Sequence, residues 1–450
     1  MQMEAADREP LNRYEDAVVR LMVNGARRKA RAKDVRLISH PLLRALAESG
    51  TAHIYADTAD IDELSALVVE GETSDAVYLY SEIDGNTTNQ ALFRKVFERY
   101  LDNEDGNNVA SWLGHLRLEK PSLTREEATI ALYSIINARL GLEALNHFSA
   151  ARPWNVSLEL HTALARDPEA AASVGRCLSA AVPDSFVKVA FTPDHPQCFL
   201  IARDLERAGV PVNFTATFSA RQVVAAAMLA NPHRTNIFMG RLSQGLEAEM
   251  LGEHVLLQAQ RQMRRLRRGF GVSTLNMAAS VRRWQTIPLT AGCDAYTVPF
   301  AVLRDFLAQR VMDHEEIERR VEADYSAELG ISGQVLGKLG LERIKRLWVV
   351  EPEFIEFLDE LRNSREFATI NGEGLFRRFD RAGFGDIFFA PTKPQWKELR
   401  ESKLPNLDSP LAKLMPLDTL YSLLAIGDFV NFQEEMDRTI RDSIEKLFQW

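Results

Sequence analysis

Eight short runs rich in apolar and β-branched residues alternate with longer amphipathic segments over residues 51–310. The runs have lengths typical of buried strands, and the segments between them carry apolar residues at helical spacing, as in Asp194–Ala208 and Ala220–Leu229. Eight strands alternating with helices over about 250 residues are typical of an α/β fold, the (β/α)8 TIM barrel. The predicted strands are His53–Ala59, Glu82–Thr88, Asn155–His161, Ser185–Phe191, Pro211–Thr217, Asn236–Leu242, Val272–Ser280 and Ala295–Phe300.

The segments on either side of this region lack the alternation. Residues 1–50 carry apolar residues at helical spacing in Arg13–Lys29 and Ser39–Ser49, which predicts N-terminal helices packed on a barrel of residues 51–310. Residues 311–450 predict a mostly helical C-terminal extension. Within it we expect helices at Asp313–Ala327, Glu351–Arg362 and Asn431–Leu447, a compact loop at Gly372–Ala390, and interrupted regular structure at the proline-containing segment Lys393–Pro416.

Charge and cysteine content exclude several classes of protein. A formal net charge of −9 does not favour non-specific nucleic-acid binding. The three cysteines include no C-x-x-C pair, which argues against a disulfide framework and a cysteine zinc site, and favours a reducing compartment. The sequence shows no signal peptide and no apolar stretch long enough to span a bilayer. We therefore expect a cytoplasmic protein without membrane contact, metal or other cofactor, and leave a homo-oligomer open.

Lys188 lies within the apolar run Ser-Phe-Val-Lys-Val-Ala-Phe, one of the predicted strands. A lysine rarely belongs in such a run unless another group pairs with it or the protein uses it. Burial disfavours a charged ammonium group, and a neutral amine can attack a ketone to form a Schiff base. The structural alternative is a strand-end lysine that reaches solvent or meets a carboxylate. The residues near the ends of the other strands favour the covalent role.

Polar residues lie in or just after every predicted strand except the eighth. Because a TIM barrel builds its active site at the carboxyl ends of its strands, these side chains are expected to converge. Their types fit the cleavage of a ketose phosphate: an imine-forming lysine, carboxylates for proton transfer, amides for hydroxyl groups and arginines for a phosphate. The candidates are Asp57, Asn89, Glu159, Lys188, Thr192, Asn213, Thr215, Arg241, Ser280 and Arg282.

Each candidate can be given a role in that reaction. Lys188 would form the imine, and Glu159 with Thr192 or Thr215 would hold a water that transfers protons to and from the carbinolamine. Asp57 would remove the proton of the substrate C4 hydroxyl. The remaining candidates would bind substrate: Asn89 and Asn213 its hydroxyls, and Arg241, Arg282 and Ser280 its phosphate.

Taken singly, these residues also have structural explanations. Asp57 could cap the helix that follows it, although Asp60 fits that position better. Glu159 could pair with an arginine, and Arg241 and Arg282 could be surface charges. The prediction therefore depends on their joint occurrence at corresponding strand positions.

Eight short motifs occur along the chain in a fixed order, each in or near a predicted strand. They are Asp57-Thr58-Ala59-Asp60, Thr87-Thr88-Asn89, Val156-Ser157-Leu158-Glu159, Val187-Lys188, Asn213-Phe214-Thr215-Ala216-Thr217-Phe218-Ser219 with Gln222, Phe238-Met239-Gly240-Arg241, Ala279-Ser280-Val281-Arg282 and Ala291-Gly292-Cys293-Asp294. In this order, over roughly residues 35–310, the chain resembles the transaldolase family.

The resemblance implies a metal-free class I aldolase-type barrel. By it, Lys188 matches the Schiff-base lysine, Asp57 the acid/base of carbon–carbon cleavage, and Glu159 and Thr215 the pair that holds the catalytic water. The family transfers a dihydroxyacetone unit from fructose 6-phosphate or sedoheptulose 7-phosphate to an aldose phosphate, in the pentose phosphate pathway. The residues predicted to bind substrate are Asn89, Asn213, Asn236 and Phe238, and the residues predicted to bind its phosphate are Arg241, Ser280 and Arg282.

Four positions refine the predicted specificity. Similar small aldolases, which release free dihydroxyacetone, carry Gln where this chain has Glu159 and Tyr where it has Phe238, so both positions favour a transaldolase. Gln90 stands where the family usually has Pro, and Asn236 where many members have Ser. With residues 311–450, which match no part of the family, these departures keep two alternatives open. One is a transaldolase-like aldolase acting on a different sugar phosphate in a specialised pathway, and the other is a catalytically silent sugar-phosphate-binding barrel.

Overall fold

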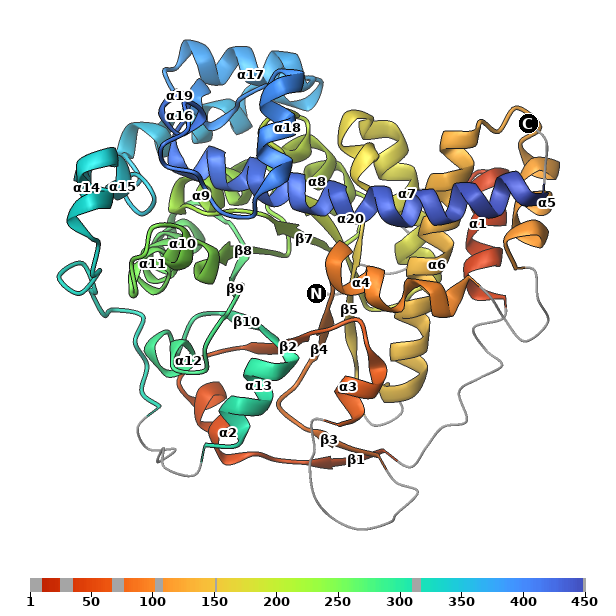
Figure 1. Ribbon diagram of the computed structural model, residues 1–450, viewed down its shortest axis with the longest axis horizontal. Helices are drawn as coiled ribbons and strands as arrows, with labels where there is room; N and C mark the ends of the chain where they lie inside the picture. The colour runs from red at the N-terminus through yellow and green to blue at the C-terminus, as the bar shows by residue number, and fades with distance from the viewer. Residues whose placement is uncertain are drawn as a thin grey trace.

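The computed structural model describes residues 10–24, 35–66, 77–101, 108–149, 152–309 and 317–447. The eight predicted strands form one closed parallel barrel, which confirms the predicted (β/α)8 fold (Figure 1). Neighbouring strands follow the chain order, and the last strand closes the ring by pairing with the first. The barrel strands are β2 (His53–Asp57), β4 (Gly85–Thr87), β5 (Asn155–Glu159), β6 (Ser185–Ala190), β7 (Val212–Thr215), β8 (Arg234–Phe238), β9 (Leu275–Ala279) and β10 (Ala295–Pro299).

The strand register determines which side chains share a layer inside the barrel. Glu159 lies beside Lys188, and Lys188 beside Asn213, so the three neighbouring strands present these side chains at one level. One layer below, the guanidinium group of Arg234 lies 4.2 Å from the ring centre of Tyr55 and 3.8 Å from that of Phe186. This packed layer fills the amino-terminal half of the barrel, so the polar layer faces the carboxyl end.

Helices surround the barrel and begin at well-defined caps. The Asp167 carboxylate accepts a hydrogen bond from the Ala170 amide of α7, and the Ser219 hydroxyl accepts one from the Gln222 amide of α9. The helices of this part of the chain are α1 (Arg13–Val23), α2 (Pro41–Glu48), α3 (Ile61–Ser65), α4 (Gln90–Val96), α5 (Asn108–Glu119), α6 (Arg125–Phe148), α7 (Pro168–Ala181), α8 (Cys198–Arg207), α9 (Ala220–Leu229), α10 (Met239–Gly245), α11 (Leu251–Phe270), α12 (Thr286–Leu289) and α13 (Phe300–Leu307). Residues 25–29 of the first predicted helix lie outside the described residues.

Two expectations for this half of the chain need correction. The strand predicted at Asn236–Leu242 starts earlier and ends at Phe238, because the chain enters α10 at Met239. A separate two-stranded parallel sheet, of β1 (Val35–Ile38) and β3 (Val77–Tyr80), was not predicted. The short run Val-Arg-Leu-Ile of β1 exposes its two central residues, so it lacks the continuous apolar character that identified the barrel strands.

The C-terminal extension is helical, but its elements differ from the prediction. Helices occupy most of Gly372–Ala390 and the start of Lys393–Pro416, where a loop and interrupted structure were expected, and Ile317–Ala327 is not helical. Asp313–Glu316 of that predicted helix lie outside the described residues. The helices of the extension are α14 (Gly333–Leu339), α15 (Leu341–Lys345), α16 (Pro352–Asn363), α17 (Gly372–Arg381), α18 (Lys393–Glu401), α19 (Leu411–Leu414) and α20 (Leu417–Leu447).

Capping and packing explain these differences. The Asn371 side chain accepts a hydrogen bond from the Gly374 amide and starts α17, which buries Leu375 and Phe379 one turn apart. Around residue 320 the chain instead follows the barrel: the Arg320 amide donates to the Ala291 carbonyl, at 2.8 Å. The helix predicted at Asn431–Leu447 begins fourteen residues earlier, at Leu417.

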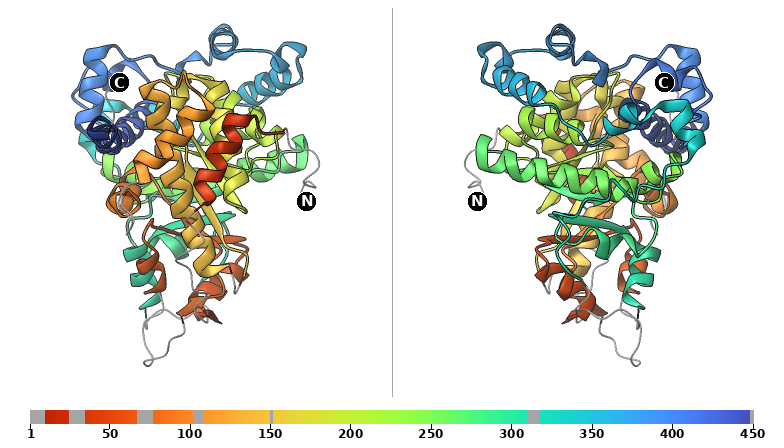
Figure 2. Two further views of the ribbon diagram at one scale, coloured as in Figure 1. Left: turned by 90° about the vertical axis from the view of Figure 1, so that its right-hand side faces the viewer. Right: turned by 90° about the vertical axis from the view of Figure 1, so that its left-hand side faces the viewer.

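Helix α20, 31 residues long, crosses the molecule from the α9 side to the α5 side (Figure 1). It contacts α4, α5, α6 and α18. The two side views show the blue helices of the extension at one end of the molecule and residues 35–48 at the other (Figure 2). Among the described residues, neither α20 nor any other helix is long and apolar enough to cross a membrane.

Candidate active site

Lys188 projects from β6 into the polar layer of the barrel, and its side chain is only 10% exposed. Its Nζ lies 3.6 Å from Oε1 of Glu159 on the neighbouring strand and donates a hydrogen bond to the Thr88 carbonyl. The Thr88 hydroxyl in turn donates to Oε2 of Glu159, at 3.3 Å. The segment after β4 and strand β5 therefore fix both the amine and its nearest carboxylate.

Asp57 ends β2, and its Oδ1 accepts a hydrogen bond from the Thr87 hydroxyl at 2.9 Å. Thr87 also hydrogen-bonds Thr297 of β10. The expectation that the eighth strand offers no polar candidate was therefore wrong. The helix after β2 is capped by Asp60, which accepts from the Asp62 amide at 3.1 Å, so the capping alternative for Asp57 is excluded.

Glu159 is buried and Asp57 is partly buried, so water solvates the charge of both carboxyl groups poorly. Burial raises the pKa of Asp57, and the nearby ammonium of Lys188 and the hydrogen bond from Thr87 oppose that rise. Burial likewise raises the pKa of Glu159, again opposed by Lys188. Each carboxyl can therefore hold a proton at a pH where an exposed one has lost it, as general acid–base catalysis requires.

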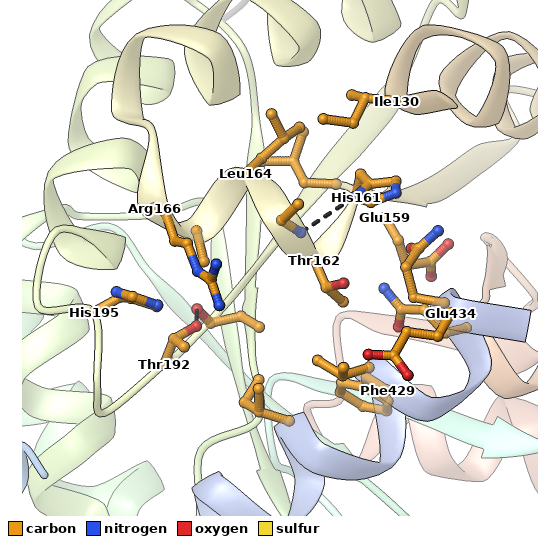
Figure 3. Close-up of a pocket in the computed structure, with 18 of the residues that line it drawn as sticks. Ile130, Glu159, His161, Thr162, Leu164, Arg166, Thr192, His195, Phe429 and Glu434 are labelled. Atoms are coloured by element: carbon orange, nitrogen blue, oxygen red, sulfur yellow. Dashed lines mark hydrogen bonds between the residues drawn. The ribbon is translucent and has the colours of Figure 1, made fainter. Parts of the chain in front are cut away.

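A cavity of about 620 Å³ connects Lys188 to the C-terminal extension. Figure 3 shows its two sides: Glu159, His161, Thr162 and Arg166 come from the barrel, and Phe429 and Glu434 from α20. Residues of α18 and α20 line the part of the cavity opposite the barrel, so a ligand that fills the cavity contacts the extension. Five of the predicted site residues line it: Asn89, Glu159, Lys188, Thr192 and Thr215.

Two of these five also have local structural roles. The Asn89 carbonyl oxygen accepts a hydrogen bond from the Leu92 amide and caps α4, so this part of its side chain is already engaged. The Thr192 hydroxyl donates to the Ala190 carbonyl, at 3.0 Å. Thr215 is 4% exposed and lies near Lys188 on the adjacent strand. Its predicted role is to hold the catalytic water.

The geometry agrees with a comparison with known families. The family model described as Transaldolase/Fructose-6-phosphate aldolase matches residues 54–336, more than half of the chain. The chain belongs to this family. No curated protein matches the chain. In the part of the chain that the structure describes, no group of His, Cys, Asp or Glu is arranged as a metal site.

The other substrate-binding residues predicted from the resemblance to the transaldolase family lie outside the described lining of the cavity. Asn213 and Asn236 are 0% and 1% exposed, and the carbonyl oxygen of each side chain has no hydrogen-bond partner. The Asn213 amide nitrogen donates to the Ser157 hydroxyl, at 3.3 Å. Phe238 packs edge-on against Phe218, with ring centres 5.3 Å apart. None of these three predicted residues is part of the described cavity lining.

The predicted phosphate-binding residues gather where β8 and β9 end. Arg241 lies in the first turn of α10, and Ser280 follows β9 with a positive φ of 58°, a strained conformation for a serine. A Cβ on Gly240 would lie 2.4 Å from Cγ of Arg282, so only glycine lets that side chain pack here. Burial, followed by the charge of Arg241, lowers the pKa of Arg282.

The contacts that α20 makes with this site were not predicted from the sequence. Nη2 of Arg241 lies 2.7 Å from Oδ2 of Asp428, and Oδ1 of Asp437 lies 2.9 Å from Nε2 of His161. His161 thus links α20 to the cavity lining beside Glu159. Asp428 had a detectable signal: it interrupts the apolar stretch Leu423–Phe432, as Lys188 interrupts its strand.

Proposed function

We propose that the protein is a transaldolase that moves a dihydroxyacetone unit between sugars through an imine at Lys188. One observation carries the proposal: a buried amine lies 3.6 Å from a buried carboxyl at the base of a cavity large enough for a sugar. Membership of the transaldolase/fructose-6-phosphate aldolase family supports the aldol chemistry.

The first half of the reaction forms the imine. The Lys188 amine attacks the C2 carbonyl of a ketose to give a carbinolamine. Glu159, with Thr215, relays a proton to the carbinolamine hydroxyl, and water leaves as the C=N bond forms. The raised pKa of Glu159, which results from burial, suits this carboxyl to donate the proton.

The second half breaks and remakes a carbon–carbon bond. Asp57 takes the proton of the C4 hydroxyl, the C3–C4 bond breaks, and its electron pair enters the iminium to leave an enamine on Lys188. The first aldose departs, and the enamine carbon attacks the aldehyde of an acceptor, whose oxygen regains a proton from Asp57. Water then hydrolyses the imine and releases the new ketose.

Transfer, rather than release of free dihydroxyacetone, is supported by two residues and by the cover of the site. Glu159 and Phe238 are the residue types that the sequence comparison with small aldolases associates with transfer. Helices α18 and α20 cover part of the cavity opposite the barrel, which reduces the access of water that would hydrolyse the enzyme-bound intermediate early. The donors expected from the family are fructose 6-phosphate and sedoheptulose 7-phosphate.

Reductive trapping tests the nucleophile directly. Borohydride added with dihydroxyacetone, or with fructose 6-phosphate, should attach a three-carbon unit to the peptide that contains Lys188, as read by mass spectrometry. Lys188→Ala should abolish trapping and lower kcat by at least about a thousand-fold, because no other group replaces the nucleophile. The exposed-site control Lys413→Ala should keep both. A folded wild-type protein that is not trapped by either sugar contradicts the proposal.

A second candidate is a transaldolase-like aldolase that acts on a different sugar. The pairing of Arg241 with Asp428 favours it, as does Gln90, which is 5% exposed and lines the cavity where the family usually has proline. A panel of ketose donors and aldose acceptors separates the two candidates. High activity with fructose 6-phosphate and erythrose 4-phosphate dismisses this one.

A further inference from the structure

Asp428 of α20 occupies the predicted phosphate site. Its Oδ2 lies 2.7 Å from Nη2 of Arg241, and its Oδ1 lies 3.1 Å from Nζ of Lys403. Arg241 is 8% and Asp428 6% exposed, whereas the Lys403 side chain is 59% exposed. The carboxylate thus uses both oxygens to bridge a buried arginine and a surface lysine. A substrate phosphate on Arg241 would have to share that arginine with a buried negative charge.

The helix that carries Asp428 is fixed on both sides of it. Ten residues earlier, Asp418 accepts hydrogen bonds from Nε and Nη2 of Arg221, at 2.7 and 2.9 Å, and one from the Ser219 hydroxyl at 2.6 Å. Nine residues later, Asp437 bonds His161. The exposed fractions of the Asp418 and Arg221 side chains are 2% and 6%.

Apolar packing holds the same helix in place. Tyr421, Phe429 and Met436 of α20 are buried in the main hydrophobic core together with barrel residues. Lifting Asp428 away from Arg241 would break a buried ion pair and expose that core, so a substrate phosphate cannot simply displace it. Asp428 is therefore a fixed part of the site and not a removable lid.

Unpartnered polar groups in or just after β8 and β9 suit neutral hydroxyls. Nη1 of Arg241 and the Ser280 hydroxyl are buried without a hydrogen-bond partner, and both can donate. The carbonyl oxygen of Asn236, 1% exposed, is a buried acceptor without a partner. Donors and acceptors together match a sugar hydroxyl, which does both, whereas a phosphate dianion only accepts.

A second observation separates the phosphate set from the reaction cavity. The cavity that reaches Lys188 extends towards Arg166, His195 and α20, and its described lining includes none of Arg241, Ser280 and Arg282. Residue 336, where the family match ends, lies well before Asp428, although the match includes the first part of the extension. The feature that neutralises Arg241 is therefore an addition of this chain to the matched region.

We propose that Asp428 sets the substrate specificity of this enzyme by replacing the distal phosphate, so that the preferred ketose ends in an uncharged hydroxyl. The inference rests on the proposed reaction at Lys188 and concerns only the far end of the substrate. Asp428 acts on that end through Arg241 and takes no part in the imine chemistry.

The full-length protein, Asp428→Asn and Asp442→Asn form the test set. Asparagine keeps the shape of Asp428 and removes only its charge, and thermal melting verifies that each variant folds. Asp442 is an exposed residue of the same helix, fourteen positions further along, so its substitution makes the same charge change about 21 Å away. Two measurements are made on each protein: the affinity for inorganic phosphate by calorimetric titration, and kcat/KM with fructose and with fructose 6-phosphate as donors.

We expect the wild-type protein to use fructose at least as well as fructose 6-phosphate. Asp428→Asn should bind inorganic phosphate at least ten-fold more tightly and shift the kcat/KM ratio at least ten-fold towards fructose 6-phosphate. Asp442→Asn should change neither. If the wild-type protein binds phosphate as tightly as Asp428→Asn, or prefers the phosphorylated donor ten-fold, the inference is wrong.

The trapping reaction with dihydroxyacetone separates this inference from the proposed function. Dihydroxyacetone lacks the distal end, so its capture on Lys188 does not depend on Asp428. Capture together with unchanged phosphate affinity in Asp428→Asn overturns only the specificity inference. Absence of capture in all three folded proteins overturns the reaction on which it rests.

Discussion

At the scale of single residues, the candidate site depends on one amine and two carboxyl groups on strands β2, β5 and β6 of the barrel. Burial raises the pKa of both Asp57 and Glu159, and the charge of Lys188 acts to lower both pKa values. The charge of Asp57 also raises the pKa of Glu159, so an apparent value from a pH–rate profile belongs to the two carboxyl groups together and not to one residue. Such a site stores destabilising electrostatic energy that packing elsewhere must offset.

Asp57→Asn should lower the catalytic activity and raise the stability of the protein at pH 8. The variant should lose about 10²- to 10⁴-fold in kcat, because the base of the cleavage step is gone, while imine trapping with dihydroxyacetone persists. In the wild type the folded-state pKa of Asp57 is raised, so the folded protein keeps a proton that the unfolded chain releases above a pH of about 4. Stability contributed by this group therefore falls as pH rises through the folded pKa.

The Asp57→Asn variant lacks the titrating carboxyl, so it should not lose this stability as pH rises. Melting temperatures of Asp57→Asn and the wild type should be close at pH 4, and the variant should melt higher at pH 8. The exposed Asp442→Asn control should show no such divergence. A variant that melts lower than the wild type at pH 8 would show that hydrogen bonds to the carboxylate outweigh its desolvation.

How far single residues can be predicted depends on how unusual they are in their local sequence. Lys188 was found because a charge in an apolar strand is rare. Asp428 is likewise a charge in an apolar stretch. Its role could not be predicted, because no local sequence pattern shows that α20 contacts the barrel. Thr297 was missed because a threonine is an ordinary strand residue. The strand register was needed to place Glu159, Lys188 and Asn213 in one layer.

At the scale of elements, periodicity located the barrel strands but not all of their ends. Most barrel strands lie within runs rich in apolar residues and are followed by a helix, so their existence and type follow from the pattern, whereas β4, Gly-Asn-Thr, is polar. The end of β8 was placed too late because Met239 and Leu242 are apolar in a helix as well as in a strand. In the extension, glycines near Gly372 predicted a loop, but they lie in the first turn of α17, where a cap offsets their low helix propensity.

The element that most needs its electrostatic contacts is α20. Burial alone would raise the pKa of Asp418. The charge of Arg221 and the hydrogen bonds from Arg221 and Ser219 outweigh burial and lower this pKa. Asp418→Asn should destabilise the protein by about 3–5 kcal/mol, since it leaves the Arg221 charge poorly compensated at a buried position. The exposed pair of Arg94 with Glu435 on the same helix is the matched control, and Glu435→Gln should cost under about 1 kcal/mol.

Urea unfolding of both variants measures this difference, and its pH dependence has a defined sign. Because the folded pKa of Asp418 is lowered, its contribution is complete above a pH of about 4 and is lost as pH falls through the folded pKa. The gap between wild type and Asp418→Asn should therefore narrow in acid. Equal costs for the buried and exposed substitutions at neutral pH would mean that the Arg221 pair does not anchor α20.

At the scale of the whole molecule, the barrel and the extension share one hydrophobic core. The main cluster of buried residues contains barrel side chains such as Val187 and Phe214 together with Tyr421 and Ile440 of α20. The helix α20, which lines the cavity opposite the barrel, is therefore integral to the fold, although it lies beyond the matched residues 54–336. Substrate entry must then use the gaps around α18 and α20 or small movements of side chains, and not removal of the extension.

A chain that ends at Pro416 should consequently fail to form a stable barrel. Burial of one large apolar side chain contributes about 1.5–3 kcal/mol, and the loss of several at once exceeds the total stability of about 5–15 kcal/mol typical of a domain.

By the same reasoning, the full-length protein should unfold in a single calorimetric transition that Asp418→Asn shifts as a whole. A truncated protein that keeps a sharp melting transition, or a full-length protein with two separate transitions, would show that the barrel folds without α20. In that case α20 could move independently, and Asp428 would be free to leave Arg241. The buried side chains of α20 on which the expectation rests are Leu417, Tyr421, Ile426, Phe429, Met436, Ile440 and Ile444.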